Sequence, residues 1–251
     1  MRIAGFQKLS TVDYPGKLAA VVFTAGCNLD CSYCHNRALI DPSTRLPWWD
    51  AREVLGILAK RRGFLDGVAI SGGEPTLQPD LEDFAGQVRD LGYAVKLDTN
   101  GTQPAVLSRL IARGLLDYVA MDVKAPLEKY ETICGAGVEI AAIESSIALL
   151  LEGQVDYEFR TTVSPLLSHE DLKAISRLVR GARRHVLQRC RPVQDGRFAE
   201  TPSHDAASYS VQTLLEWAEG MRENAQVLLT RGMGMPEASG RDSHTVLYPG
   251  A

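Results

Sequence analysis

Short apolar runs rich in β-branched residues alternate with longer stretches of helical spacing along most of this chain. Strands that alternate with helices predict βαβ units and a parallel sheet. The pattern therefore predicts an α/β fold, a partial (β/α)6 barrel of the TIM type with parallel strands and outer helices over residues 1–231. The expected strands are 18–24, 68–71, 94–98, 118–123, 157–162, 186–190 and 227–230, and the expected helices are 49–62, 79–92, 104–113, 139–151, 170–180 and 206–221.

Charge and hydropathy narrow the classes of partner. The formal net charge is −4, so no overall basic balance favours nucleic acid or an anionic membrane as a partner. Gln7, Lys8 and Asp13 interrupt the N-terminal stretch where a signal peptide needs apolar residues, and the early apolar run 18–23 is too short to cross a bilayer. We therefore expect a soluble, cytoplasmic protein. Gly, Pro and Ser are frequent in 232–251, which we expect to be a poorly ordered tail.

Four polar motifs follow the first four predicted strands. They are GCNLDCSYCHN at 26–36, SGGEPT at 71–76, LDTNGT at 97–102 and MDVKAP at 121–126. In α/β barrels the functional side chains lie at the carboxyl ends of the strands and on the loops that follow. The four motifs are therefore predicted to converge on one site.

Three of the five cysteines, Cys27, Cys31 and Cys34, form the pattern C-x3-C-x2-C. Thiolates suit zinc, copper(I) or iron–sulfur clusters. Structural zinc prefers paired C-x2-C ligands, and the sequence holds no second pair; Cys134 and Cys190 stand alone and are expected to be packing residues. A [4Fe–4S] cluster normally takes four cysteines, so three would leave one iron open to a substrate or cofactor. A partial zinc knuckle or chance clustering is the alternative.

The cysteine pattern on a loop after the first barrel strand resembles the radical S-adenosylmethionine (SAM) superfamily. The resemblance implies one [4Fe–4S] cluster whose open iron binds the methionine moiety of SAM. Reductive cleavage of SAM would then give methionine and a 5′-deoxyadenosyl radical that abstracts a hydrogen atom from the substrate. Tyr33 and His35 flank Cys34 and are expected beside the cofactor, Tyr33 near the adenine.

The resemblance also assigns the remaining motifs to SAM. Gly72, Gly73 and Glu74 match the family's GGE motif, which binds the SAM amino group; a glycine-rich turn before a helix is the alternative for this motif alone. The other implied contacts are Asp98, Thr99, Asn100, Asp122, Lys124 and Gln188. The aspartates would help to form a SAM site that can include a monovalent cation, and Lys124 would approach the SAM carboxylate. Asp98 and Asp122 would otherwise be helix N-caps and Lys124 a surface residue.

The stretch GFQKLSTVDYPGK, residues 5–17, is similar to the activating proteins of anaerobic ribonucleoside-triphosphate reductases. This resemblance implies an enzyme that leaves a glycyl radical on a partner, an anaerobic ribonucleotide reductase, with an electron donor such as flavodoxin or ferredoxin. The alternative is a radical SAM enzyme that acts on a small nucleotide- or pterin-like molecule. A non-catalytic metal-binding module is a third class, which four convergent motifs disfavour. No second cysteine cluster follows the first, so no auxiliary iron–sulfur domain is expected.

Overall fold

The computed structural model describes residues 1–40, 46, 48–135, 137–190, 209–231 and 244–247. The chain divides into two compact units. The first unit contains Met1–Asn28, Asn36–Ala120 and Ala142–Asp156, and the second contains Leu29–His35, Met121–Ala141 and Tyr157–Ala251. Both units therefore draw on segments that are distant in the sequence.

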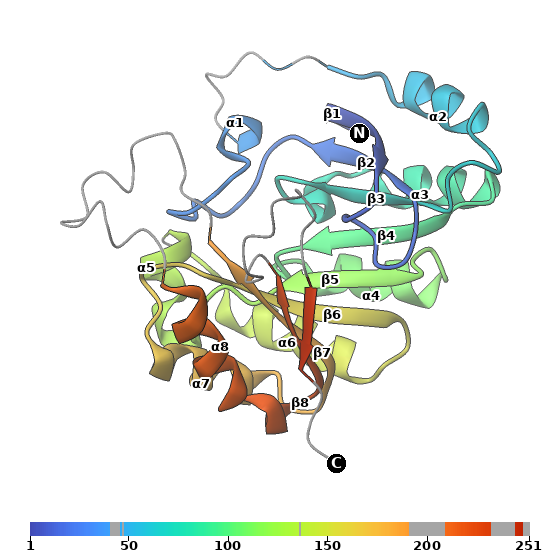
Figure 1. Cartoon of the computed structure of the whole chain (residues 1–251). Helices are drawn as coiled ribbons and strands as arrows, with labels where there is room; N and C mark the ends of the chain where they lie inside the picture. Colours follow the sequence, from blue (N-terminus) through green and yellow to red (C-terminus); the bar gives the residue numbers. More distant parts are fainter. Residues whose placement is uncertain (41–45, 47, 136, 191–208, 232–243, 248–251) are drawn as a thin grey trace. The chain divides into compact units, whose positions relative to one another are not determined.

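Four strands form the sheet of the first unit (Figure 1): β1 (Ile3–Ser10), β2 (Ala19–Thr24), β3 (Gly67–Gly72) and β4 (Ala94–Thr99). β1 runs antiparallel to β2, whereas β2, β3 and β4 run parallel to one another. β2 and β3 are almost wholly buried, which is typical of parallel strands covered on both faces. The carboxyl ends of the three parallel strands consequently lie at the same edge of this sheet.

The helices of this unit begin where the local sequence supplies a helix start. Asp50 caps α2, accepting a hydrogen bond from the Arg52 amide at 2.7 Å, as N-cap carboxylates do. Pro104 occupies the first turn of α4, where its missing N–H costs nothing. The elements are α1 (Arg37–Ile40), α2 (Ala51–Ala59), the 3-10 turn η1 (Pro75–Leu77), α3 (Leu81–Asp90) and α4 (Pro104–Ala112), with most of α6 (Ile140–Leu151).

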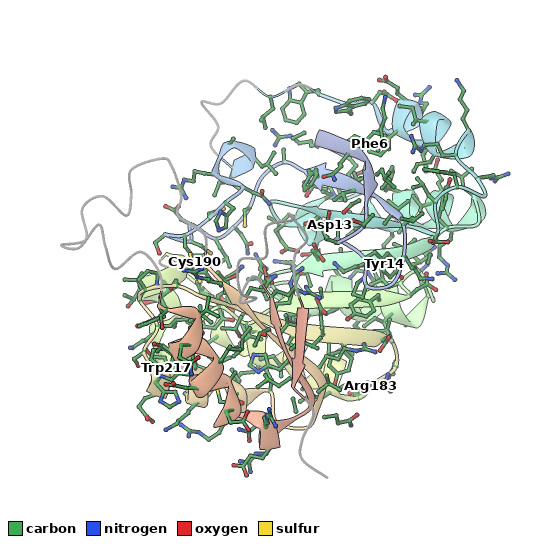
Figure 2. All side chains as sticks on the ribbon, in the orientation of Figure 1. Phe6, Asp13, Tyr14, Arg183, Cys190 and Trp217 are labelled. Carbon is green, nitrogen blue, oxygen red and sulfur yellow. The ribbon has the colours of Figure 1, made fainter. Side chains whose placement is uncertain are left out.

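A tight turn joins β1 to β2 and explains part of the N-terminal motif. The Lys17 amide donates to the Tyr14 carbonyl at 3.1 Å, and Gly16 has a φ of +70°, which suits the third position of a type II turn with Pro15 before it. Tyr14, labelled in Figure 2, is buried and packs with Ala19 and Tyr118. The sequence pattern did not predict β1, because Gln7 and Lys8 interrupt its apolar run and three of its last four residues are exposed.

The second unit repeats the alternation of strand and helix. β5 (Tyr118–Asp122) leads from the first unit into the second. β6 (Asp156–Val163), β7 (Ala182–Arg189) and β8 (Ala225–Arg231) are parallel, and β9 (His244–Leu247) is antiparallel to β8.

The helices of the second unit include α7 (His169–Leu178) and α8 (Val211–Glu219), which lie beside each other (Figure 1). The His169 ring of α7 stacks on the Trp217 ring of α8, with ring centroids 5.1 Å apart. A capping box between Ser168 and Asp171 starts α7, a device that satisfies two amides at the helix end. The elements are the 3-10 turn η2 (Leu127–Lys129), α5 (Tyr130–Cys134), α7 (His169–Leu178), α8 (Val211–Glu219) and the 3-10 turn η4 (Arg222–Asn224).

The predicted fold class is confirmed in its main feature, a parallel-dominated α/β arrangement in which every predicted strand is present. Residues 206–208 of the last predicted helix lie outside the described residues, and α8 begins at Val211. Of the predicted tail, 232–251, the structure describes only β9. None of the helices in the described ranges has the length and apolarity that crossing a membrane requires.

Candidate functional site

The loop that carries Cys27 packs backbone against backbone with the end of β3. The Gly73 amide donates to the Thr24 carbonyl at 2.9 Å, and the Glu74 amide donates to the Gly26 carbonyl at 2.8 Å. A Cβ on Gly73 would overlap the Gly26 carbonyl oxygen, and one on Gly72, whose φ is +121°, would overlap the backbone of Thr24. The two glycines of the GGE motif are therefore required for this close approach.

Glu74 is fully buried and is hydrogen-bonded within the first unit. Its Oε1 accepts from the Thr76 amide at 3.1 Å, the Thr76 hydroxyl at 2.5 Å and the Thr99 hydroxyl at 2.8 Å, and its Oε2 accepts from the Asn100 amide at 2.6 Å. Burial raises the pKa of Glu74, and these donors oppose that rise. The carboxylate thus ties the loop after β3 to the end of β4.

Asn100, whose backbone amide binds Glu74, also contacts the first cysteine through its side chain. Its Nδ2 lies 3.7 Å from Cys27 Sγ and 3.1 Å from Asn28 Oδ1. Thr102 holds the other end of the amide, because its backbone N–H donates to Asn100 Oδ1 at 3.0 Å. An amide donor directed at a sulfur stabilises negative charge on a thiolate. The structure therefore brings Cys27, Glu74, Thr99 and Asn100 together within the first unit.

Asp98 lies two residues after Lys96 on β4, and the two side chains form an ion pair. Residues two apart on a strand face the same way. Lys96 is almost fully buried, although no sequence motif pointed to it. The sequence held a signal for this pair, because a lysine two residues before an aspartate in a strand lies on the same face as the aspartate.

The second unit holds Cys31 and Cys34, whose loop is fastened to α5. The Asp30 amide donates to the Cys134 carbonyl at 2.8 Å, and the Ser32 amide donates to the Ile133 carbonyl at 3.1 Å. A side-chain hydrogen bond with Cys134 lowers the pKa of Cys31 to about 7, against the effect of burial. Cys134, predicted to be a packing residue, therefore also contacts a predicted ligand.

The aromatic residue and the histidine beside Cys34 differ in exposure. Tyr33 is buried, its hydroxyl has no hydrogen-bond partner in the described part of the chain, and burial raises its pKa. His35 is exposed. A buried hydroxyl without a partner is uncommon and points to a group that would complete the site.

Asp122 lies between two cations of the second unit. Its Oδ1 accepts from Arg160 Nε at 2.8 Å, and its Oδ2 accepts from Lys124 Nζ at 3.1 Å. Burial alone would raise the pKa of Asp122, but the charges of Arg160 and Lys124 lower it to about 2. Burial works against the charged form of Lys124, yet the Asp122 carboxylate raises its pKa well above the usual range. The trio is left with one positive charge in excess, which suits a carboxylate ligand.

Arg160 was missed at the sequence level, although a charged side chain inside the predicted strand 157–162 was a visible signal. Gln188, another predicted contact, is half-buried near the end of β7. It is paired in register with Thr162 of β6 and with Arg231 of β8. Gln188 thus lies at the same edge of the parallel strands as Arg160 and two residues farther along.

Within each unit, the residues around the motif cysteines are of the kind that an iron–sulfur cluster uses. Thiols are the ligands that such clusters use, an amide donor lies against one of them, and a buried tyrosine hydroxyl next to another lacks a partner. Among the described residues, no three His, Cys, Asp or Glu side chains are already gathered in a metal-binding arrangement. The three-cysteine ligand set therefore stays a prediction that rests on spacing and on family.

The model of the radical SAM superfamily matches residues 21–179. This chain belongs to the radical SAM superfamily. The matched segment contains all four motifs and the strands from β3 to β6 in full. The chain is accordingly a radical SAM enzyme, and membership of the superfamily implies a [4Fe–4S] cluster and SAM as cofactors.

Two curated relatives of this radical SAM protein are similar to it in sequence. A Methanocaldococcus jannaschii protein, whose name ascribes to it the activation of a glycyl-radical enzyme, is 34% identical over 209 residues, which are 80% of this chain and 85% of that protein. The pyruvate formate-lyase-activating enzyme of Clostridium pasteurianum is 33% identical over 150 residues, 54% of this chain and 58% of that enzyme.

A solved structure shares the α/β fold. Streptococcus suis SuiB, crystallised with S-adenosylmethionine, superimposes with a TM-score of 0.63 at 15% identity, over 82% of this chain and 48% of SuiB. At this identity the likeness concerns the fold alone. It confirms the fold class that the alternation of strands and helices predicted.

Proposed function

We propose that this radical SAM enzyme generates a glycyl radical on a partner enzyme, and that the partner is an anaerobic ribonucleotide reductase. The observation that carries the proposal is the similarity to the M. jannaschii protein, which extends over most of both chains. The partial match to a pyruvate formate-lyase-activating enzyme agrees with it. The finer assignment of the partner rests on the N-terminal stretch 5–17, part of which forms β1 and the Tyr14 turn.

The cofactors would be held by residues of the four motifs. Cys27, Cys31 and Cys34 would ligate the cluster, which together with SAM supplies a radical that removes a hydrogen atom from carbon. The Asn100 amide donates toward the Cys27 sulfur and stabilises its negative charge. Lys124 is the cation proposed to meet the SAM carboxylate, and Asp122 orients it through their ion pair.

The predicted monovalent cation is not needed for this proposal. Asp98 already lies against Lys96, and Asp122 lies against Arg160 and Lys124. Cationic side chains thus neutralise both carboxylates. The remaining proposed contacts with SAM are Tyr33, His35, Gly72, Gly73, Thr99 and Gln188, with Glu74 acting through the loops it joins.

The cluster is tested first, by anaerobic purification and measurement of iron and labile sulfide. The parent should hold one [4Fe–4S] cluster, and replacement of Cys27, Cys31 or Cys34 by alanine should remove it. Cys190→Ala, a change at a buried cysteine outside the motif, is the matched control and should keep the cluster. Stoichiometric zinc without iron after anaerobic reconstitution would refute the assignment.

The activating function is tested with the reduced enzyme, SAM and an anaerobic ribonucleotide reductase from the same source, with reduced flavodoxin or ferredoxin as the electron donor. The electron paramagnetic resonance spectrum should show a glycyl doublet that collapses when the partner's glycine is deuterated at its α-carbon. The absence of a partner radical, combined with strong stimulation of SAM cleavage by a nucleotide or pterin, would replace this proposal with the small-molecule alternative.

A further inference from the structure

A fourth sulfur lies against the cysteine loop, although it is more than a hundred positions away from Cys31 in the sequence. Cys134 ends α5, is 1% exposed, and forms a side-chain hydrogen bond with Cys31, which is 7% exposed. Both residues belong to the second unit. The C-x3-C-x2-C motif does not include Cys134, so the motif alone assigns it no role.

The backbone places Cys31 at the end of α5, where Cys134 lies. The carbonyls of the last turn of a helix have no partners within the helix. Here the amides on either side of Cys31, those of Asp30 and Ser32, donate to the carbonyls of Cys134 and Ile133. Two hydrogen bonds that straddle one residue hold that residue against the helix end, and Cys31 is the residue between them.

A glycine after the C-terminal end of α5 allows this close contact. Gly135 follows Cys134 with a φ of +90°, and a Cβ at that position would lie 3.2 Å from the Asp30 Cβ. Only glycine adopts this backbone conformation without strain. The cysteine loop therefore lies close against the end of α5, and Cys134 is buried at this contact.

We propose that the Cys134 thiol donates a hydrogen bond to the Cys31 sulfur when Cys31 ligates iron, and so raises the reduction potential of the cluster. The inference rests on the cluster assignment made under the proposed function. Reduction adds negative charge to the cluster and its sulfur ligands, and a hydrogen-bond donor stabilises the more negative state. Cys134 is thus a positioning residue that tunes the cluster without ligating it.

The test is a redox titration of the cluster in the full-length protein, with four variants. Cys134→Ala and Cys134→Val lack a donor, Cys134→Ser retains one, and Cys190→Ala changes a buried cysteine elsewhere. We expect full iron and sulfide in all four. The midpoint potential should become more negative in the Ala and Val variants, and the Ser and Cys190→Ala variants should stay near the parent. Either donor-free variant suffices for the comparison.

Three results would overturn the inference. One is an unchanged potential in the variants without a donor, and another is an equal shift in Cys134→Ser, which would reflect packing. The third is loss of the cluster in the Ala and Val variants with retention in Cys190→Ala, which would make Cys134 a ligand. If the parent itself holds no cluster, the proposed function fails as well; if it holds one whose potential ignores Cys134, only this inference fails.

Discussion

Replacement of Glu74 by glutamine separates two roles for the GGE motif, a direct contact with SAM and an internal brace. The carboxylate is fully buried and accepts four hydrogen bonds from Thr76, Thr99 and Asn100. Glutamine has nearly the same shape but replaces one acceptor oxygen with an NH2 donor. The substitution therefore changes the hydrogen bonding and leaves the packing almost untouched.

The expected loss of folding stability follows from the buried donors that the substitution leaves without an acceptor. In the better orientation the amide oxygen replaces Oε1, and the NH2 group faces the Asn100 amide. Each buried donor group left without a partner costs about 1–3 kcal/mol, and two such groups arise: the Asn100 N–H and the new NH2 group itself. Burial raises the pKa of Glu74, so a neutral side chain recovers part of this cost. The net loss expected is about 2 kcal/mol, which for a chain of this size lowers the melting temperature by about 4–8 °C.

The assay is thermal unfolding of the cluster-free protein, followed by circular dichroism. Glu144→Gln is the matched control, because Glu144 is exposed on α6, and it should change stability by less than about 0.5 kcal/mol. A Glu74→Gln variant that melts with the parent, yet binds SAM more weakly, would refute the internal brace and restore the direct contact.

Two further predictions concern other residues. Gly73→Ala should displace the Gly26 carbonyl and reduce the iron bound per chain. Its control is Gly56→Ala in α2, where a Cβ meets nothing within 4 Å; this variant should keep the iron and raise the free energy of unfolding by about 0.5–1 kcal/mol. Equal iron in both variants would contradict the close approach. Since the pKa of Asp122 is lowered to about 2, its ionised form stabilises the fold above about pH 4, and this contribution is lost as the pH falls towards 2. Asp122→Asn should therefore be less stable than the parent at pH 7 and lose less stability between pH 4 and 2 in urea titrations; parallel curves would argue against the ion pair with Arg160.

The strands and helices could be predicted because their signals are local. The apolar run before Cys27 became β2, the run before Gly72 became β3, and Gly92 and Gly114, both with positive φ, follow the ends of α3 and α4. These signals depend on side-chain period and backbone freedom over a few residues. The same locality placed the motifs after the strands, since the carboxyl end of a strand is a position in the sequence.

The sequence by itself determined which residues the family motifs contain and at which strand ends they lie. Only the tertiary structure decided what those side chains contact: Glu74 is held by the donors of Thr99 and Asn100, Asp122 is bound by Arg160, and Cys134 meets Cys31. The physical reason is that a motif's spacing is covalent, whereas a side chain's partner is set by the folding of segments tens to a hundred residues apart. Hydrogen bonds and charges between such segments leave no periodic signal in the sequence.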